Sequence, residues 1–184
     1  FALSKIKIED YTGISSLFRS IDTQYIFEGA QGILLDQDFG FFPNVTRSNT
    51  TSKNAIDVYK RLTSTSRDPH LDIYYITRTY QTRHGVGFMS DEKPLDLKNN
   101  ENETNVSHAY QGNFRVGELD PDMLNYAIES DTHFSKGCRK HLVISCMDQY
   151  EIDVDDLLSK LKYKFTSVFI SRGPNPKDIT EYKK

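Results

Sequence analysis

The sequence predicts an α/β domain in which a mainly parallel sheet is flanked by helices. Short runs rich in β-branched and aromatic residues alternate along the chain with amphipathic stretches, and polar segments separate them. A chain of 184 residues is long enough to enclose one apolar core. We therefore expect residues 1–184 to form a single domain.

The first half of the chain is expected to contain two helices and two strands. Apolar residues at helical spacing predict a helix over residues 11–21, and an apolar run predicts a strand over residues 24–27. Asn54 is a candidate cap for a helix over residues 55–63. A run of β-forming residues predicts the second strand over residues 71–77.

The second half begins with a polar segment, residues 91–108, whose composition predicts a mobile loop. Amphipathic spacing then predicts two helices, and apolar runs predict two further strands. Polar residues 181–184 are expected to fray. The expected helices cover 119–128 and 153–161, and the expected strands cover 141–148 and 167–171.

The overall composition excludes several classes of protein. A net charge of -3 does not fit a general nucleic-acid binder. No apolar run approaches the roughly 18 residues that cross a bilayer, and the first residues lack the pattern of a signal peptide. The two cysteines, Cys138 and Cys146, fit free thiols in a reducing compartment. We expect a cytoplasmic protein without nucleic-acid or membrane partners.

The densest group of ligand-binding residue types lies in residues 27–51, FEGAQGILLDQDFGFFPNVTRSNTT. Gly29 and Gly32 allow the backbone to approach another group closely after the expected strand. The polar run 44–51 offers hydroxyls, amides and one guanidinium to an oxygen-rich ligand such as a phosphate. Residue types alone also fit an ordinary surface loop.

The order of these residues closely resembles the nucleotide-binding signature of the adenylosuccinate synthetase family, whose members join inosine monophosphate (IMP) to L-aspartate at the expense of GTP. The resemblance implies the later, C-terminal part of that P-loop-NTPase-like fold, in a divergent member. It also implies an IMP-binding site. The residues it assigns there are Gln31, Gly32, Thr46 and Asn49.

Two further segments resemble the family's aspartate site. Thr82-Arg83 precedes Gly85-Val86-Gly87, and the family has threonine-arginine and glycine-x-glycine at this point. Arg115 is the arginine that matches a cluster of several in the family. A guanidinium pairs with a carboxylate through two parallel hydrogen bonds. The resemblance therefore implies that Thr82, Arg83 and Arg115 bind aspartate.

The nucleotide base is expected at Asp148 and Gly173. Asp148 ends the segment Ser145-Cys146-Met147-Asp148, where the family has threonine-lysine-x-aspartate, and Gly173 matches a glycine turn that touches guanine. Because the lysine is absent, the choice between GTP and ATP stays open. Asp148 also fits a residue that caps the turn before Ile152.

The chain contains no glycine-aspartate-glutamate-glycine-lysine-glycine phosphate loop. We expect the catalytic residues and the Mg²⁺ site upstream, in a longer ligase that the family leads us to expect as a homodimer, so this chain alone would be inactive. One alternative is a non-catalytic purine-nucleotide-binding module derived from the same fold. Another is a synthetase for a different purine or amino acid.

Overall fold

The structure is a computed structural model, and it describes residues 25–63, 71–98, 107, 109, 110 and 112–183. The helix expected over residues 11–21 lies outside these ranges. No helix among the described residues is long and apolar enough to cross a membrane.

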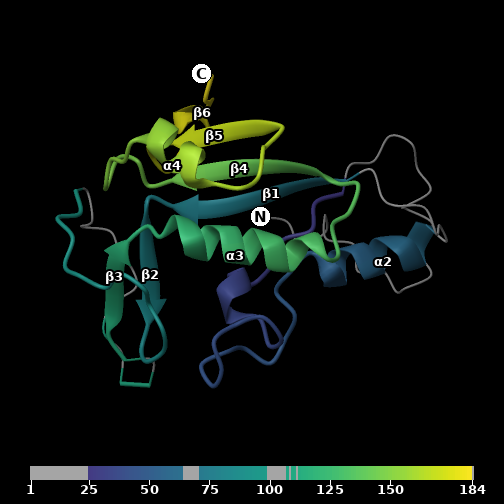
Figure 1. Ribbon diagram of the computed structural model, residues 1–184, viewed down its shortest axis with the longest axis horizontal. Helices are drawn as coiled ribbons and strands as arrows, with labels where there is room; N and C mark the ends of the chain where they lie inside the picture. The colour runs from purple at the N-terminus through teal and green to yellow at the C-terminus, as the bar shows by residue number, and fades with distance from the viewer. Residues whose placement is uncertain (1–24, 64–70, 99–106, 108, 111, 184) are drawn as a thin grey trace, which may run out of the picture.

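The main sheet has four strands in the order β1-β4-β5-β6 (Figure 1). The first three, β1 (Asp72–Arg78), β4 (Arg139–Ser145) and β5 (Ser167–Ser171), run parallel, and β6 (Ile179–Glu181) is antiparallel to β5. The predicted mainly parallel sheet is confirmed. The strand expected over 141–148 ends at Ser145, because Cys146 takes a left-handed conformation with φ 64° that leaves the strand.

Three α-helices accompany the sheet: α2 (Lys53–Thr63), α3 (Pro121–Thr132) and α4 (Val154–Lys160). Asp120 caps α3 by accepting hydrogen bonds from the backbone N–H groups of Asp122 and Met123. Helix α2 begins one residue before Asn54, so the expected cap is wrong. The Asn54 side chain donates instead to the carbonyl of Asn49 at 3.1 Å.

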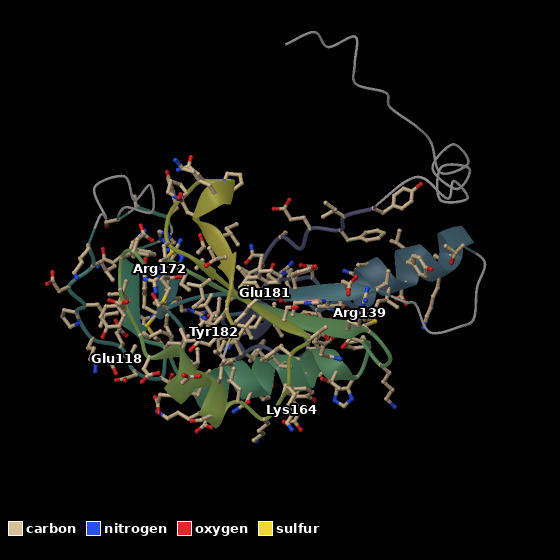
Figure 2. The ribbon with its side chains drawn as sticks, turned by 90° about the horizontal axis from the view of Figure 1, so that it is seen from above. Glu118, Arg139, Lys164, Arg172, Glu181 and Tyr182 are labelled. Atoms are coloured by element: carbon tan, nitrogen blue, oxygen red, sulfur yellow. The ribbon has the colours of Figure 1, made fainter. Side chains whose placement is uncertain are left out.

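The apolar core lies between the sheet and α4 (Figure 2). Leu142 and Ile144 of β4 and Ile170 of β5 are almost completely buried there. The helical side contributes Val154, Leu157 and Leu161. Leu142 and Ile144 are two residues apart on β4, so the period-2 geometry of a strand puts both side chains on the face that meets this core.

The strand expected over 24–27 is not present in the described residues 25–27, which have no regular secondary structure. Ile26 is 94% exposed. A strand forms only beside a hydrogen-bonded neighbour, and no strand of the described part of the chain pairs with this segment. The apolar run alone therefore predicts a strand that the described residues 25–27 do not form.

A second, two-stranded sheet was not predicted. Strands β2 (Tyr80–His84) and β3 (Phe114–Glu118) pair antiparallel, with Arg83 directly opposite Arg115. The tail was also misjudged, since Glu181 belongs to β6 and the N–H of Tyr182 donates to the carbonyl of Val168 at 2.7 Å. The β2–β3 pairing joins residues 80–84 to residues 114–118, a separation that local patterns do not reveal.

The first part of the expected mobile loop 91–108 is tied to β3. Glu92 forms a bridge with Gly117, and the N–H of Lys93 donates to the carbonyl of Val116 at 3.2 Å. The prediction is wrong for these residues because backbone hydrogen bonds, which composition does not show, hold them. Residues 99–106 and 108 lie outside the described residues.

Candidate functional site: the carboxyl edge of the sheet and its polar loop

The carboxyl ends of β4 and β5 bring the Asp148 and Gly173 turns to the same edge of the sheet. The N–H of Met147 donates to the carbonyl of Ser171 at 3.1 Å, which joins the two turns. The half-buried Asp148 follows Met147 within the turn after β4. In open α/β sheets, ligands bind in crevices outside the carboxyl ends of the strands.

The turn after β5 needs a glycine at position 173. A Cβ there would lie 2.6 Å from Oδ2 of Asp178. The Asp178 carboxylate is itself fixed, since it accepts from the backbone N–H of Asn175 at 2.9 Å and from the Asn175 side chain at 3.0 Å. The Ser171 hydroxyl donates to the carbonyl of Gly173 at 2.9 Å. This turn is therefore held in one shape before any ligand binds.

A hollow of about 570 Å³ lies beside these turns, between α4 and β6. Its lining includes Arg172, Glu181 and Tyr182, which Figure 2 labels, but neither Asp148 nor Gly173. Arg172 faces Glu151 across it at 3.5 Å. The hollow is thus a polar neighbour of the predicted base site rather than the site itself.

The polar loop, residues 32–51, is organised around one buried carboxylate. Asp36 is fully buried and accepts hydrogen bonds from the backbone N–H groups of Asp38, Phe39 and Thr50. Burial by itself raises the pKa of Asp36, but these N–H donors, with that of Thr51, outweigh it and hold the pKa below its usual value. The loop therefore has a fixed shape that depends on an ionised side chain.

The predicted IMP residues all lie on this loop or at its start. Gln31 and Gly32 are exposed, and the carbonyl of Gly32 accepts from the Thr50 hydroxyl at 3.0 Å. The N–H of Thr46 donates to the carbonyl of Leu35 at 2.8 Å. The Asn49 amide donates to Asp38 at 2.8 Å, which makes it part of the loop's own framework.

The predicted aspartate residues lie on the β2–β3 hairpin, where two guanidinium groups hold the turn Gly85–Gly87. Arg115 donates to the carbonyls of Gly85 and Gly87 at 2.8 and 2.9 Å, and Arg83 donates to that of Val86 at 3.0 Å. Gly85 and Gly87 both have positive φ, at 65° and 122°, which suits glycine. Thr82 pairs across the hairpin with Val116.

Glu92 is a member of this group that sequence reasoning missed. Both of its carboxylate oxygens accept from Arg115, through Nε at 2.8 Å and through NH2. This pairing raises the pKa of Arg115 and lowers that of Glu92. Burial, with the neighbouring charge of Arg115, lowers the pKa of Arg83. Glu92 lies in residues 91–108, whose composition predicts only a loop. Its hydrogen bonds with Arg115 are therefore what identify it as part of this group.

The hairpin connects the two groups of predicted residues. Arg83 donates to the carbonyl of Asn44 in the polar loop at 2.8 Å. At the other end of β2, the Tyr80 hydroxyl donates to Gln149, next to Asp148, at 2.7 Å. Hydrogen bonds from β2 therefore link the polar loop, the arginine pair and the turn that contains Asp148.

The described residues contain no group of three or more His, Cys, Asp or Glu side chains that could hold a metal ion.

A sequence model of the adenylosuccinate synthetase family matches residues 5–166. The chain belongs to the adenylosuccinate synthetase family. The synthetase of Marinobacter nauticus is 36% identical over 177 residues, which cover 90% of this chain and 36% of that protein. The synthetase of Thermoplasma volcanium is 34% identical over 108 residues, which cover 58% of this chain and 24% of that protein.

A solved structure supports the same fold. The succinoaminodeoxyadenylate synthetase of cyanophage S-2L, bound to dGMP and to dATP as an energy donor, matches with a TM-score of 0.56. The identity is 13%, and the match covers 83% of this chain and 45% of that chain. This chain thus spans between 24% and 45% of the length of these three synthetases.

Proposed function

We propose that this chain forms the substrate- and base-binding part of a purine-nucleotide ligase that joins IMP and L-aspartate. The observation that carries this proposal is the pair of hydrogen bonds by which β2 links Asn44 of the polar loop to Gln149 beside Asp148. In the proposed reaction, the γ-phosphate of a nucleoside triphosphate passes to O6 of IMP. The amino group of aspartate then attacks C6 and displaces the phosphate.

The polar loop is the proposed IMP site. Gln31 and Gly32 are exposed at its start, where they can meet the reacting edge of the purine. Thr46 and Asn49 would face the phosphate of IMP. Because Asp36 fixes the loop beforehand, binding orders few additional residues, which lowers the entropic penalty of binding.

The arginine hairpin is the proposed aspartate site, with Thr82, Arg83 and Arg115. Four hydrogen bonds from Arg115 already go to Glu92 and to two carbonyls. We therefore assign Arg115 mainly the task of fixing the Gly85–Gly87 turn. The carboxylates of aspartate would bind beside this turn, which the guanidinium groups of Arg83 and Arg115 hold in place.

The nucleotide base would lie at Asp148 and Gly173. A carboxylate can accept two hydrogen bonds from the N1–H and exocyclic amine of guanine, a pair that adenine does not offer. GTP is therefore the first candidate. ATP is the second, because Cys146 stands where the family has a lysine and because the phage synthetase is bound to dATP as an energy donor.

Titration calorimetry of the chain with GTP and with ATP tests this assignment. Asp148→Asn should weaken GTP binding by about tenfold, roughly 1.4 kcal/mol, and leave ATP binding unchanged. Asp122→Asn is the matched control, since Asp122 is exposed on α3. An unaltered ratio of GTP to ATP affinity would mean that Asp148 only caps its turn.

The alternative is a non-catalytic module that binds a purine nucleotide. It is favoured by Cys146, which stands where the family has a lysine, and by Arg115, which matches only one arginine of a family cluster. In the ligase proposal, Mg²⁺ and the phosphate loop come from polypeptide outside these 184 residues, and the assembled enzyme is a cytoplasmic homodimer. Nucleotide binding without turnover, even after the remaining part of a synthetase is supplied, would support the module instead.

A further inference from the structure

Gln149 follows Asp148 in the turn after β4, and three hydrogen bonds fix its position. Its backbone N–H donates to the carbonyl of Cys146 at 3.0 Å, and its own carbonyl accepts from the N–H of Lys98 at 2.9 Å. The side-chain oxygen Oε1 accepts from the hydroxyl of Tyr80 at 2.7 Å. Long polar side chains lose rotamer freedom when they are ordered, and this one is ordered before any ligand binds.

The groups around the Tyr80 hydroxyl determine which end of the Gln149 amide it holds. Nη1 of Arg78 lies 3.2 Å from the hydroxyl, and because a guanidinium only donates, the hydroxyl oxygen accepts from it. Tyr80 is 2% exposed, and burial raises the pKa of its hydroxyl, which therefore keeps its proton at neutral pH. An amide oxygen is a stronger acceptor for that proton than the neighbouring sulfur of Cys146. Gln149 therefore turns its oxygen toward Tyr80 and its NH2 group away from it.

The NH2 group of Gln149 is the part of this side chain that is left for a ligand. Gln149 is half-buried, and in the described part of the chain the bond from Tyr80 is the one hydrogen bond of its side chain. The amide nitrogen carries two N–H donors and no acceptor. The carboxylate of the adjacent Asp148 accepts hydrogen bonds and donates none. Two adjacent residues of this turn therefore offer a donor and an acceptor.

Guanine has an edge that is complementary to this pair. Its O6 accepts a hydrogen bond, whereas adenine has at the same position a 6-amino group that donates. We propose that the Gln149 amide donates to O6 of guanine and thereby selects guanine over adenine. This inference rests on the proposed function, because it uses the base position at Asp148. There the carboxylate accepts from N1–H and the 2-amino group, and Gln149 binds the remaining polar atom of that edge.

Tyr80 makes this contact discriminate against adenine. An amide that is able to rotate would present its oxygen to the 6-amino group of adenine as readily as its nitrogen to O6. The bond from Tyr80 keeps the oxygen engaged, so adenine at this position brings one donor against another. Arg78 and Tyr80 are positioning residues, since both act through Gln149. Selection of guanine by this route needs no lysine at position 146.

Titration calorimetry of the 184-residue chain with GTP, inosine triphosphate (ITP) and ATP tests the contact with O6. ITP has O6 and N1–H but lacks the 2-amino group, so it reports on O6 without the full contact to Asp148. The unmodified chain should bind GTP and ITP at least about tenfold more tightly than ATP. Gln149→Glu keeps an oxygen for Tyr80 but replaces the donor by an acceptor. It should weaken GTP and ITP binding by about tenfold or more and strengthen ATP binding.

Two further variants separate the donor from its charge and from its orientation. Gln149→Met is neutral and of similar length, and it should weaken GTP and ITP binding without strengthening ATP binding. Tyr80→Phe frees the amide to rotate, so the ratio of ATP to GTP affinity should rise by about threefold or more. Tyr126→Phe is the matched control and should leave that ratio unchanged, because its hydroxyl donates to the carbonyl of Phe39 in the polar loop at 2.7 Å. Circular dichroism checks that each variant is folded.

Several results would overturn the proposal. One is an unchanged ratio of GTP to ATP affinity in Gln149→Glu, and another is tighter binding of ATP than of GTP by the unmodified chain. A variant that loses affinity for GTP but not for ITP would assign the effect to the 2-amino group, and hence to Asp148. These results reject the inference and leave the base position standing. If the unmodified chain binds none of the three nucleotides, the proposed base position is wrong, and this inference with it.

Discussion

The polar loop, residues 32–51, and the core beside α4 are both well-formed parts of this molecule, but different forces hold them. The core is an apolar cluster around Leu142 and Ile144, whose stability comes from removing apolar surface from water. The polar loop is arranged around the buried carboxylate of Asp36, and its Phe41 ring also contacts Phe88, with 4.6 Å between ring centroids. The backbone of the loop therefore depends on one ionised group, whereas the core depends on apolar burial.

The largest effect should come from a cavity in the core. Leu142→Ala removes a side chain that is 1% exposed, and we expect a loss of about 4 kcal/mol in the free energy of unfolding. Urea unfolding followed by circular dichroism measures it. The loss should be the same at pH 7 and pH 5, because no ionisable group is removed. A loss below about 1 kcal/mol would show that the site collapses around the smaller residue.

A slightly smaller loss, of about 3 kcal/mol, should follow Asp36→Ala, because it leaves several buried N–H groups without an acceptor. The loop should also respond to acid. Since the folded pKa of Asp36 is depressed, its stabilising contribution is present above the unfolded value of about 3.9 and disappears as the pH falls through the lower folded pKa.

Amide exchange of Thr50 and Thr51 measures both effects. Their protection should fall in the variant and in acid while that of Ile144 in the core persists. Asp57→Ala, at an exposed carboxylate on α2, is the control and should change protection little. Equal loss of protection in loop and core would mean that the two regions unfold as one unit, which would end the distinction drawn between them.

The third effect concerns the shape of the loop. A Cβ on Gly40 would lie 2.6 Å from the carbonyl oxygen of Asp36 and 2.8 Å from that of Leu34. Backbone atoms cannot move aside, so Gly40→Ala should lower stability by about 2 kcal/mol. Gly29→Ala is the matched control because nothing lies within 4 Å of its Cβ position. Unfolding by heat compares the two, and equal melting temperatures would contradict the close packing.

The same contrast explains what the sequence could and could not predict. The parallel strands and their helices follow from local apolar patterns, which is why β1 and β5 were placed within one residue. The β2–β3 pairing and the role of Glu92 depend on contacts between segments distant in sequence, whereas β6 is a short exposed strand without an apolar pattern. The strand expected over residues 24–27 is wrong in its described part for a related reason. The apolar pattern of these residues is local, but a strand also needs a hydrogen-bonded neighbour, and none of the described strands pairs with them.

The candidate site shows this division residue by residue. The order of residues 27–51 predicted that Gln31, Gly32, Thr46 and Asn49 belong together, and one loop carries them. The sequence did not indicate that the Asn49 amide is engaged with Asp38, or that two guanidinium groups hold one turn. The assignment of these residues to one site stays a prediction, and the distribution of hydrogen-bond donors and acceptors among them requires coordinates.

The buried carboxylate of Asp131 gives α3 a mechanical role. It accepts from the Tyr75 hydroxyl of β1 at 2.6 Å and from the backbone N–H of Ser52, just after the polar loop, at 2.6 Å. Asp131 is completely buried, and burial of the Tyr75 hydroxyl, together with the charge of Asp131, raises the pKa of that hydroxyl. One carboxylate of α3 therefore joins β1 of the main sheet to the residue that follows the polar loop. A change in the position of either segment changes a hydrogen bond to the same side chain.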